Sequence, residues 1–205
     1  MGLTAEVIGS SLDALAARNV QIARALARVG YPEPRIRERG FATLLRTIVG
    51  QQVSVAAAAA IWRRLEQRLG TPPSPGVLVA LDDDALRSCG LSRQKALYAR
   101  SLAEHIMSGR LDFDALPAED EEAIACLTAV HGIGRWSAEI YLMFAEGRPD
   151  IWPAGDLAVR EGLGRILELP ARPTEGAVRH LGDAWRPHRS ALALFTWHAY
   201  SSPAL

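Results

Sequence analysis

The sequence predicts an all-α fold of about ten helices. Apolar residues recur at helical spacing along most of the chain, and glycine and proline separate the segments. No stretch alternates with a period of two while being rich in Val, Ile and Thr. The 205 residues, of which 49% are hydrophobic and 22% charged, suffice for one sizeable domain or two small lobes.

The first expected helices lie in the N-terminal third. Residues 10–30, SSLDALAARNVQIARALARVG, carry apolar residues at helical spacing and predict a helix that stops at Gly30. Residues 40–70 predict two helices that break near Gly50, the second containing the strongly helix-forming run Ala56–Ala60. The sequence TPPSPG at 71–76 predicts a loop.

The later helices carry clearer end signals. Residues 91–109 predict a helix with Ser92 as its N-cap and Gly109 at its end. Residues 117–130 begin PAEDEE, and acidic residues in a first turn suit the helix dipole. Further helices are expected over 156–169, 174–185 and 188–201.

Composition argues against several classes of protein. The sequence has no run of about 18 uncharged apolar residues and no secretory signal pattern, so we expect a cytoplasmic protein without a membrane span. Cys89 and Cys126 cannot hold a four-cysteine iron–sulfur cluster, and a reducing cytoplasm disfavours a disulfide. A catalytic metal is not expected, because the histidines show no ligand spacing: His105, His131, His180, His188 and His198.

The charge is balanced overall but not along the chain. The 23 basic and 23 acidic residues give a net charge of zero, which argues against a nucleic-acid partner. However, residues 1–111 hold 15 basic and 9 acidic residues (+6), whereas residues 112–205 hold 8 and 14 (−6). Of the basic residues, 22 are arginines, which suit bidentate phosphate contacts, although GC-rich codon usage explains the same bias.

The stretch LTAVHGIGRWSAEIYL at 127–142 predicts two helices joined by a tight turn. Gly132 and Gly134 can adopt positive φ and expose backbone N–H groups, with Ile133 pointing into the core. The next helix is expected to begin near Arg135, and its unpaired N–H groups and positive dipole end would bind an anion such as a DNA phosphate. The alternative is an ordinary turn with a glycine C-cap.

Five segments, in order, resemble the helix-hairpin-helix/GPD superfamily of DNA glycosylases. LTAVHGIGRWSAEI resembles the hairpin motif L-x-x-x-P-G-I-G-x-x-[ST]-A. The other four are LLRTIVGQQVSVAAAAAIWRRL, GLSRQKALYARSLA, WPAGDLAVREGLG and WRPHRSALALFTWHAY. The resemblance covers most of residues 40–200 and points to the 3-methyladenine DNA glycosylase II (AlkA-type) branch. His131 replaces the usual proline, and no trace of that branch's N-terminal β domain is found, so a short form is implied.

The resemblance implies a single glycosylase domain over residues 1–205, with its active-site cleft between two lobes. One lobe would comprise residues 1–39 and 149–205. The other would comprise residues 40–148, including the helix-hairpin-helix near 127–146. A monomer without a cofactor is expected.

The resemblance assigns the catalytic role to Asp156, beside C1′ of a flipped nucleotide. A carboxylate there stabilises the positive charge that builds on the sugar and aligns or deprotonates a water. Judged by the residues alone, Asp156 is a helix N-cap after Gly155. Trp136 stands where bifunctional relatives carry the lysine that forms a Schiff base, so a monofunctional enzyme with water as nucleophile is implied.

The implied substrate is double-stranded DNA containing alkylated bases, in the nucleoid. No paired general acid is evident, and a cationic N3- or N7-methylpurine leaves without protonation. Electron-rich aromatic faces attract such a base. The candidate pocket walls are Trp136, Trp197, Tyr141 and Trp152.

Further residues are implied to contact DNA. Gln51 and Gln52 follow Gly50, and Gln52 lies where the family inserts a wedge into the gap left by the flipped nucleotide. The alternative is an exposed helix N-terminus. The hairpin would contribute His131, Gly132, Ile133, Gly134, Arg135 and Ser137. A structural Na⁺ or K⁺ would lie on the backbone carbonyls of Thr128, Val130 and Ile133.

Two alternatives stay open. The first is a non-catalytic helix-hairpin-helix module that grips phosphates; Asp156 argues against it, because a mere binder has no need of an acid facing an anionic backbone. The second is a glycosylase for deaminated, oxidised or etheno bases, which only the shape of the pocket decides.

Overall fold

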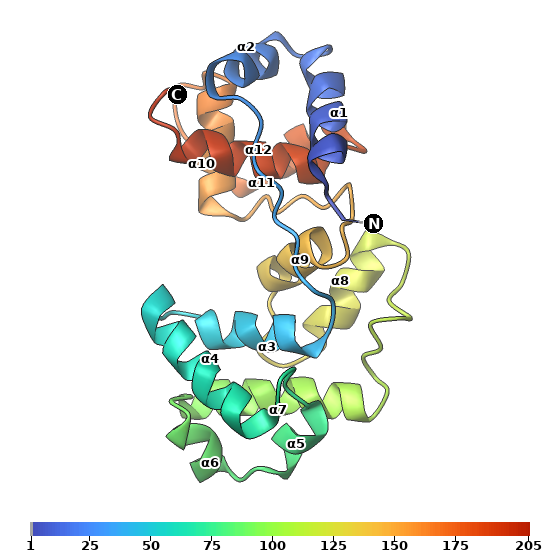
Figure 1. Ribbon diagram of the computed structural model, residues 1–205. Coiled ribbons are helices and arrows are strands. Elements are labelled where there is room, and N and C mark those ends of the chain that lie inside the picture. Colours follow the sequence, from blue (N-terminus) through green and yellow to red (C-terminus); the bar gives the residue numbers. More distant parts are fainter. Residues whose placement is uncertain (1) are drawn as a thin grey trace. The chain divides into compact units, whose positions relative to one another are not determined.

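The computed structural model describes residues 2–205, and over that range it consists of twelve α-helices and one 3-10 helix, without a β-strand (Figure 1). The predicted all-α fold is therefore confirmed. The chain divides into two compact units, Met1–Ile36 with Leu142–Leu205, and Arg37–Tyr141. The active-site cleft implied between two lobes stays a prediction.

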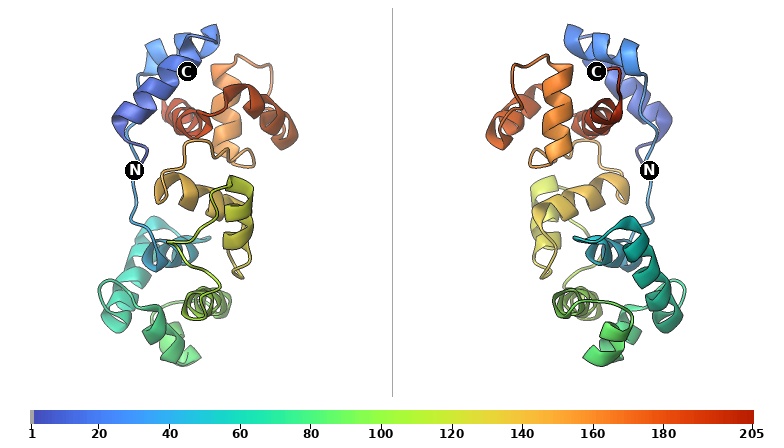
Figure 2. Two further views of the ribbon diagram at one scale, coloured as in Figure 1. Left: turned by 90° about the vertical axis from the view of Figure 1, so that its right-hand side faces the viewer. Right: turned by 90° about the vertical axis from the view of Figure 1, so that its left-hand side faces the viewer.

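The first unit is built around one buried helix, α12 (Arg189–Ser201). Every residue from Ser190 to Trp197 is buried, as expected for a helix that is apolar on all sides. Figure 1 and Figure 2 show the elements of this unit, of which α1, α2, α10 and η1 contact α12. Their bounds are α1 (Ala5–Ala16), α2 (Val20–Val29), α10 (Leu157–Ile166), α11 (Glu175–Leu181) and η1 (Gly182–Trp185).

The helix predicted over residues 10–30 is divided in two. Asn19 interrupts it, because its side-chain oxygen accepts hydrogen bonds from the N–H groups of Gln21 and Ile22, both at 3.0 Å, and so caps α2. This local cap competes with helix continuation, as asparagine side chains commonly do.

The helices α10 and α12 approach closely enough for their backbones to meet. A Cβ atom on Gly162 would lie 2.0 Å from the Thr196 carbonyl oxygen, so only glycine fits at this crossing. The close approach matters for the site described below, because Asp156 precedes α10 and Trp197 follows Thr196 on α12.

The second unit packs its helices around α7 (Arg93–Met107), which contacts α3 (Phe41–Gly50), α5 (Pro75–Ala80) and α6 (Asp83–Ser88). Its core includes Leu44 and Ile48 of α3 and Leu102 of α7, all fully buried. The remaining helices are α4 (Val55–Leu69), α8 (Asp120–Thr128) and α9 (Arg135–Phe144), which begins in this unit.

Two short helices in this unit were not expected. The loop predicted at 71–76 already ends at Pro75, which occupies the first turn of α5, a position where its missing N–H is not needed. Asp82 caps α6 by accepting a hydrogen bond from the Ala85 N–H at 2.7 Å. Helices of six residues are too short for periodicity to reveal them.

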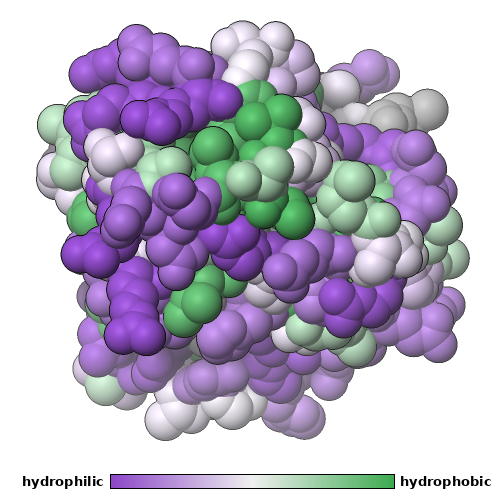
Figure 3. All heavy atoms as spheres, turned by 90° about the horizontal axis from the view of Figure 1, so that it is seen from below, coloured by the Kyte–Doolittle hydropathy of each residue, from purple (hydrophilic) through white to green (hydrophobic). Residues whose placement is uncertain are grey.

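Hydrophilic side chains cover most of the face seen in Figure 3, and hydrophobic residues gather there in a patch and a few smaller spots. Some exposed apolar surface is ordinary for a globular protein. Among the helices that the structure describes, none is both long enough and apolar enough to cross a membrane.

Candidate functional site

Asp156 is held at the N-terminus of α10 by two hydrogen bonds to one carboxylate oxygen. Its Oδ1 accepts from the backbone N–H of Val159 at 2.9 Å and from the indole Nε1–H of Trp197 at 3.0 Å. The first bond is an N-cap, which the residues alone predicted. The second joins the two residues that the resemblance named as catalytic and as pocket wall.

Trp197 brings aromatic and cationic groups to the same place. The side chain is only 9% exposed, and its ring centroid lies 5.8 Å from that of Phe144, with the two planes tilted by 45°. The Arg35 guanidinium carbon lies 5.8 Å from the Trp197 ring centroid, within the range of a cation–π contact. The Trp197 indole therefore donates to a carboxylate through its edge and accepts a cation on its face.

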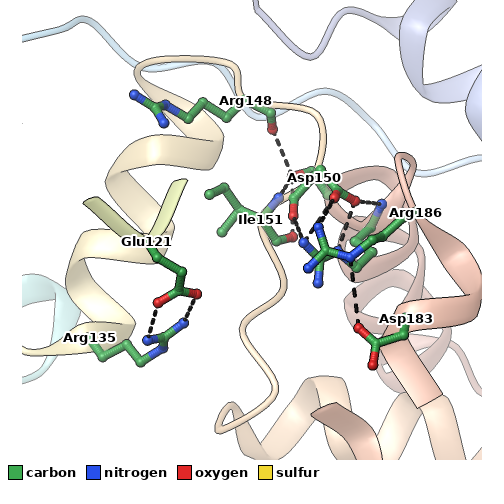
Figure 4. A network of polar contacts seen from close by, with 9 residues as sticks. Glu121, Arg135, Arg148, Asp150, Ile151, Asp183 and Arg186 are labelled. Atoms are coloured by element: carbon green, nitrogen blue, oxygen red, sulfur yellow. Dashed lines mark hydrogen bonds and ion pairs between the residues drawn. The ribbon is translucent and has the colours of Figure 1, made fainter. Parts of the chain in front are cut away.

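The loop before Asp156 is fixed by the start of α12 (Figure 4). The Arg189 guanidinium donates to both Asp150 carboxylate oxygens, at 2.8 and 2.9 Å, and to the Asp150 carbonyl at 2.6 Å. Arg186 donates to Asp150 as well, at 2.9 Å. Because Asp150 and Arg189 are mostly buried, this pair anchors the loop more firmly than a surface ion pair does.

Ser190 adds a buried bridge to the same loop. Its hydroxyl donates to the Arg148 carbonyl at 2.7 Å and accepts from the Ile151 N–H at 2.9 Å. The sequence motif WRPHRS contained Arg189 and Ser190, but their partners lie about 40 residues earlier. No local pattern could have linked them.

Two of the predicted wall residues lie in cores with their polar atoms engaged. The Trp152 indole donates to the Val178 carbonyl at 2.9 Å, and its ring meets that of Trp185 edge-on at 5.6 Å. The Tyr141 hydroxyl, in the other unit, accepts from the Gly40 N–H at 2.8 Å. These contacts give both residues a packing role. Trp136 differs, because it is 48% exposed on the first turn of α9.

The hairpin uses its two glycines differently. Gly132 has φ +94°, and a Cβ atom there would lie 2.1 Å from Cγ of Tyr98. Gly134 was expected to take positive φ as well, but it does not, and its Cβ position faces open space. Ile133 between them is buried, as the pattern predicted. Conformation and packing therefore require glycine at 132, while nothing inside the protein requires it at 134.

Three contacts fix the hairpin to the rest of the second unit. The His131 N–H donates to Ser101 Oγ at 3.1 Å, and its ring meets Tyr98 edge-on at 4.8 Å. The Gln51 side-chain amide donates to the Gly132 carbonyl at 3.0 Å. The residue next to Gln51, Gln52, is exposed with φ +54°. The structure thus joins the glutamine turn to the hairpin.

Arg135, which is predicted to assist phosphate binding, is hydrogen-bonded to carboxylates of the protein itself. Arg135 donates to both Glu121 carboxylate oxygens, at 2.9 and 2.6 Å (Figure 4). It also donates to Glu139 at 2.8 Å. Hydrogen bonding to Glu121 raises the pKa of Arg135, although burial opposes this effect. Ser137 is buried. Arg135 would have to leave two carboxylates to reach a phosphate.

The predicted cation ligands follow the C-terminal end of α8. Thr128 is its last residue, and the terminal carbonyls of a helix carry the negative end of the dipole. The Val130 carbonyl accepts from the Ile133 N–H at 3.0 Å, while the His131 N–H turns away to Ser101. Carbonyl oxygens are hard donors of the kind that Na⁺ and K⁺ prefer, and the cation on Thr128, Val130 and Ile133 stays a prediction. Among the described residues, no group of three or more His, Cys, Asp or Glu side chains is placed to hold a metal.

Fold and site together define a class of protein. The profile of the HhH-GPD superfamily of base excision DNA repair proteins matches residues 45–187. This chain belongs to that superfamily.

Its relatives narrow the class to 3-methyladenine glycosylases. The chain is 35% identical over 158 residues to DNA-3-methyladenine glycosylase 1 of Schizosaccharomyces pombe, covering 75% of this chain and 69% of the relative. It is 30% identical over 188 residues to DNA-3-methyladenine glycosylase 2 of Escherichia coli, covering 85% and 64%. The predicted superfamily and branch are confirmed.

Solved structures agree with the sequence relatives. The DNA-3-methyladenine glycosidase of Bacillus halodurans superposes with a TM-score of 0.87 at 32% identity, covering 94% of this chain and 89% of that one. The 3-methyladenine DNA glycosylase Mag1 of Schizosaccharomyces pombe, in complex with abasic DNA, gives a TM-score of 0.79 at 31% identity, covering 92% and 95%.

Proposed function

We propose that this chain is a monofunctional DNA glycosylase that removes alkylated purines of the 3-methyladenine and 7-methylguanine type from duplex DNA. The observation that carries the proposal is the hydrogen bond between Asp156 and Trp197, which joins a carboxylate to an aromatic ring already in contact with the Arg35 cation. The names of the relatives support the same substrate class.

The reaction needs stabilisation of a developing cation. The bond between C1′ and the base nitrogen breaks, its electron pair goes to the base, and the cationic methylpurine leaves as a neutral molecule. Asp156 stabilises the positive sugar, and water adds to C1′ while its proton passes to the carboxylate or to solvent. The products are the free base and an abasic site.

The alternative is a covalent route, in which a lysine attacks C1′ and forms a Schiff base, and this chain has no lysine available for it. Lys95 is its only lysine. Its ammonium donates to the Val49 carbonyl at 2.8 Å, and the side chain is buried in the second unit. Trp136 stands at the position of the Schiff-base lysine of bifunctional relatives. Hydrolysis by water follows from these two residues.

DNA would bind to the second unit, at the hairpin and at the turn that carries Gln51 and Gln52. Gly134 leaves room for a phosphate at the start of α9, and Gln52 would enter the duplex as the wedge. A Na⁺ or K⁺ on the carbonyls of Thr128, Val130 and Ile133 would support the hairpin. The protein would act as a monomer on the DNA of the nucleoid.

The test is release of free bases from methylated duplex DNA by the wild type and by Asp156→Asn. Asparagine keeps the N-cap of α10, so the variant should fold normally. We expect the wild type to release methylated purines and the variant to lose most of this activity, because its neutral amide cannot stabilise a sugar cation.

The other outcomes separate the alternatives. DNA binding without release by the wild type would favour a binding module or a different lesion, and etheno and deaminated substrates would then distinguish the two. Equal release by both proteins would show that Asp156 is not the catalytic group.

A further inference from the structure

Lys95 differs from the other basic residues of the chain in its type and in its burial. The chain has 23 basic residues, and the other 22 are arginines. Lys95 lies on α7 and is only 9% exposed, whereas long basic side chains usually keep their charge in water. Burial lowers its pKa. The mechanism proposed above makes no use of this residue.

The Lys95 ammonium caps the end of a neighbouring helix. It donates to the Val49 carbonyl at 2.8 Å, and Val49 is the penultimate residue of α3. Carbonyls at a helix C-terminus lack intrahelical partners and carry the negative end of the dipole, so a buried cation is favourable there. An ammonium is a compact donor on a flexible stem, whereas a guanidinium is a planar fork, which gives a reason for lysine at this one position.

The chain turns sharply immediately after this cap. The C-cap of α3 is Gln51, whose side chain donates to the Gly132 carbonyl of the hairpin at 3.0 Å. Gln52 follows with φ +54°, a conformation that is unfavourable for a residue with a side chain. Such a conformation persists only where its surroundings impose it. Lys95 and Gly132 supply restraints on the residues just before Gln52.

We propose that Lys95 is a positioning residue for base flipping, which locks the C-terminus of α3 so that Gln52 is presented outward in its left-handed conformation. This inference rests on the proposed glycosylase function and on Gln52 as the wedge. A wedge lowers the free energy of the flipped state by filling the gap in the duplex. Loosening the turn should therefore impair flipping and leave bond cleavage intact.

The test compares a base that must be flipped with one that is already unpaired. Lys95→Met keeps an unbranched apolar side chain of nearly the same length and removes the ammonium group. Single-turnover release of 7-methylguanine is measured from one oligonucleotide duplex with cytosine opposite the lesion and from another with an abasic-site analogue opposite it. We expect release from the paired duplex to fall about tenfold, as for loss of a charged hydrogen bond, and release from the unpaired duplex to stay within about twofold.

Two control variants separate positioning from loss of stability. Gln52→Ala removes the wedge itself and should show the same selective loss, and combining it with Lys95→Met should cause little further loss. Ala99→Gly weakens α7 one turn further along without touching the Val49 cap, and it should lower the melting temperature without discriminating between the two duplexes. Fluorescence of 2-aminopurine next to the lesion reports flipping directly, and it should fall in Lys95→Met.

Each outcome of these measurements either supports or overturns the positioning role of Lys95. An equal loss on both duplexes, or no loss on either, overturns the role of Lys95. If Lys95→Met does not fold, Lys95→Gln gives the same comparison, because its shorter neutral side chain cannot supply the cation to Val49. If the wild type releases no base from either duplex, the proposed release of alkylated purines itself fails, and that outcome is distinct from failure of the Lys95 proposal.

Discussion

At the scale of single residues, Asp156 accepts two hydrogen bonds through the same oxygen, one from α10 and one from Trp197. The N-cap fixes the carboxylate relative to its own helix, and the indole fixes it relative to α12. Such fixed orientation is what an electrostatic catalyst needs, because the carboxylate then requires no reorganisation when charge develops. The structural role of Asp156 is thus compatible with the catalytic role that we propose for it.

Replacing Trp197 with Phe tests this orientation. The variant keeps an aromatic ring beside Phe144 but loses the donor to Asp156. We expect the single-turnover rate of base release to fall roughly ten- to a hundredfold, as for loss of about 1.5–3 kcal/mol from a hydrogen bond to a charged group. Rates are measured with enzyme in excess over methylated DNA.

Trp185→Phe is the matched control for this prediction. Trp185 is a buried tryptophan of the same unit that packs on Trp152, so its replacement has a comparable packing cost. Release should stay close to wild type in this variant. If both variants slow release equally, the Asp156–Trp197 bond has no special role.

At the scale of elements, the two glycines of the hairpin have different roles. Gly132 is required by the backbone conformation and packing, whereas Gly134 would be required for binding DNA. Gly132→Ala forces a side chain into positive φ and against Tyr98, so we expect a loss of roughly 2 kcal/mol or more in the free energy of unfolding. Gly134→Ala meets no protein atom, and its free energy of unfolding should change by less than about 0.5 kcal/mol. Chemical denaturation measures both.

Gly134→Ala also tests whether a phosphate binds at this turn. A methyl group at position 134 would crowd the N–H groups at the start of α9, and DNA affinity should fall roughly fivefold, as for loss of about 1 kcal/mol. Unchanged affinity in Gly134→Ala would show that no phosphate approaches this turn. The measurement is fluorescence anisotropy with duplex DNA.

Periodicity and end signals predicted most of the helices, because long amphipathic segments with caps carry strong local information. They missed α5 and α6, which have fewer than two turns each, and the Asn19 break, where a side-chain cap competes with an otherwise continuous pattern. Within the site, the resemblance named Asp156 and Trp197. Their hydrogen bond depends on the close crossing of α10 and α12 at Gly162, which sequence spacing does not report.

Contacts between distant segments were the least predictable. Asp150 and Arg189 are 39 residues apart, and each alone looks like an ordinary surface charge. Arg135 shows how a residue gains a partner that the sequence pattern does not name. Its place at a helix start predicts a phosphate ligand, which stays a prediction, and in the structure it is hydrogen-bonded to Glu121, 14 residues earlier. Charge at a helix terminus indicates a partner of opposite sign without identifying that partner.

At the scale of the whole molecule, net charge determines the long-range electrostatic attraction between the protein and DNA. The chain carries equal numbers of basic and acidic residues, so little long-range attraction to the phosphate backbone is expected. Several arginines are also engaged by carboxylates, including Arg135, Arg186 and Arg189. The protein should therefore bind undamaged duplex only modestly.

The dependence of binding on salt tests this expectation directly. Each phosphate neutralised by a basic side chain contributes about −0.9 to the slope of log K against log salt concentration for duplex DNA. We expect a shallow slope, well short of the value of about −9 that ten phosphate contacts would give. The slope is measured with undamaged duplex and with duplex containing an abasic-site analogue.

A steep slope on undamaged DNA would mean that arginines leave their carboxylate partners when the protein binds. In that case Glu121→Gln, which releases Arg135 from one of its carboxylates, should strengthen DNA binding.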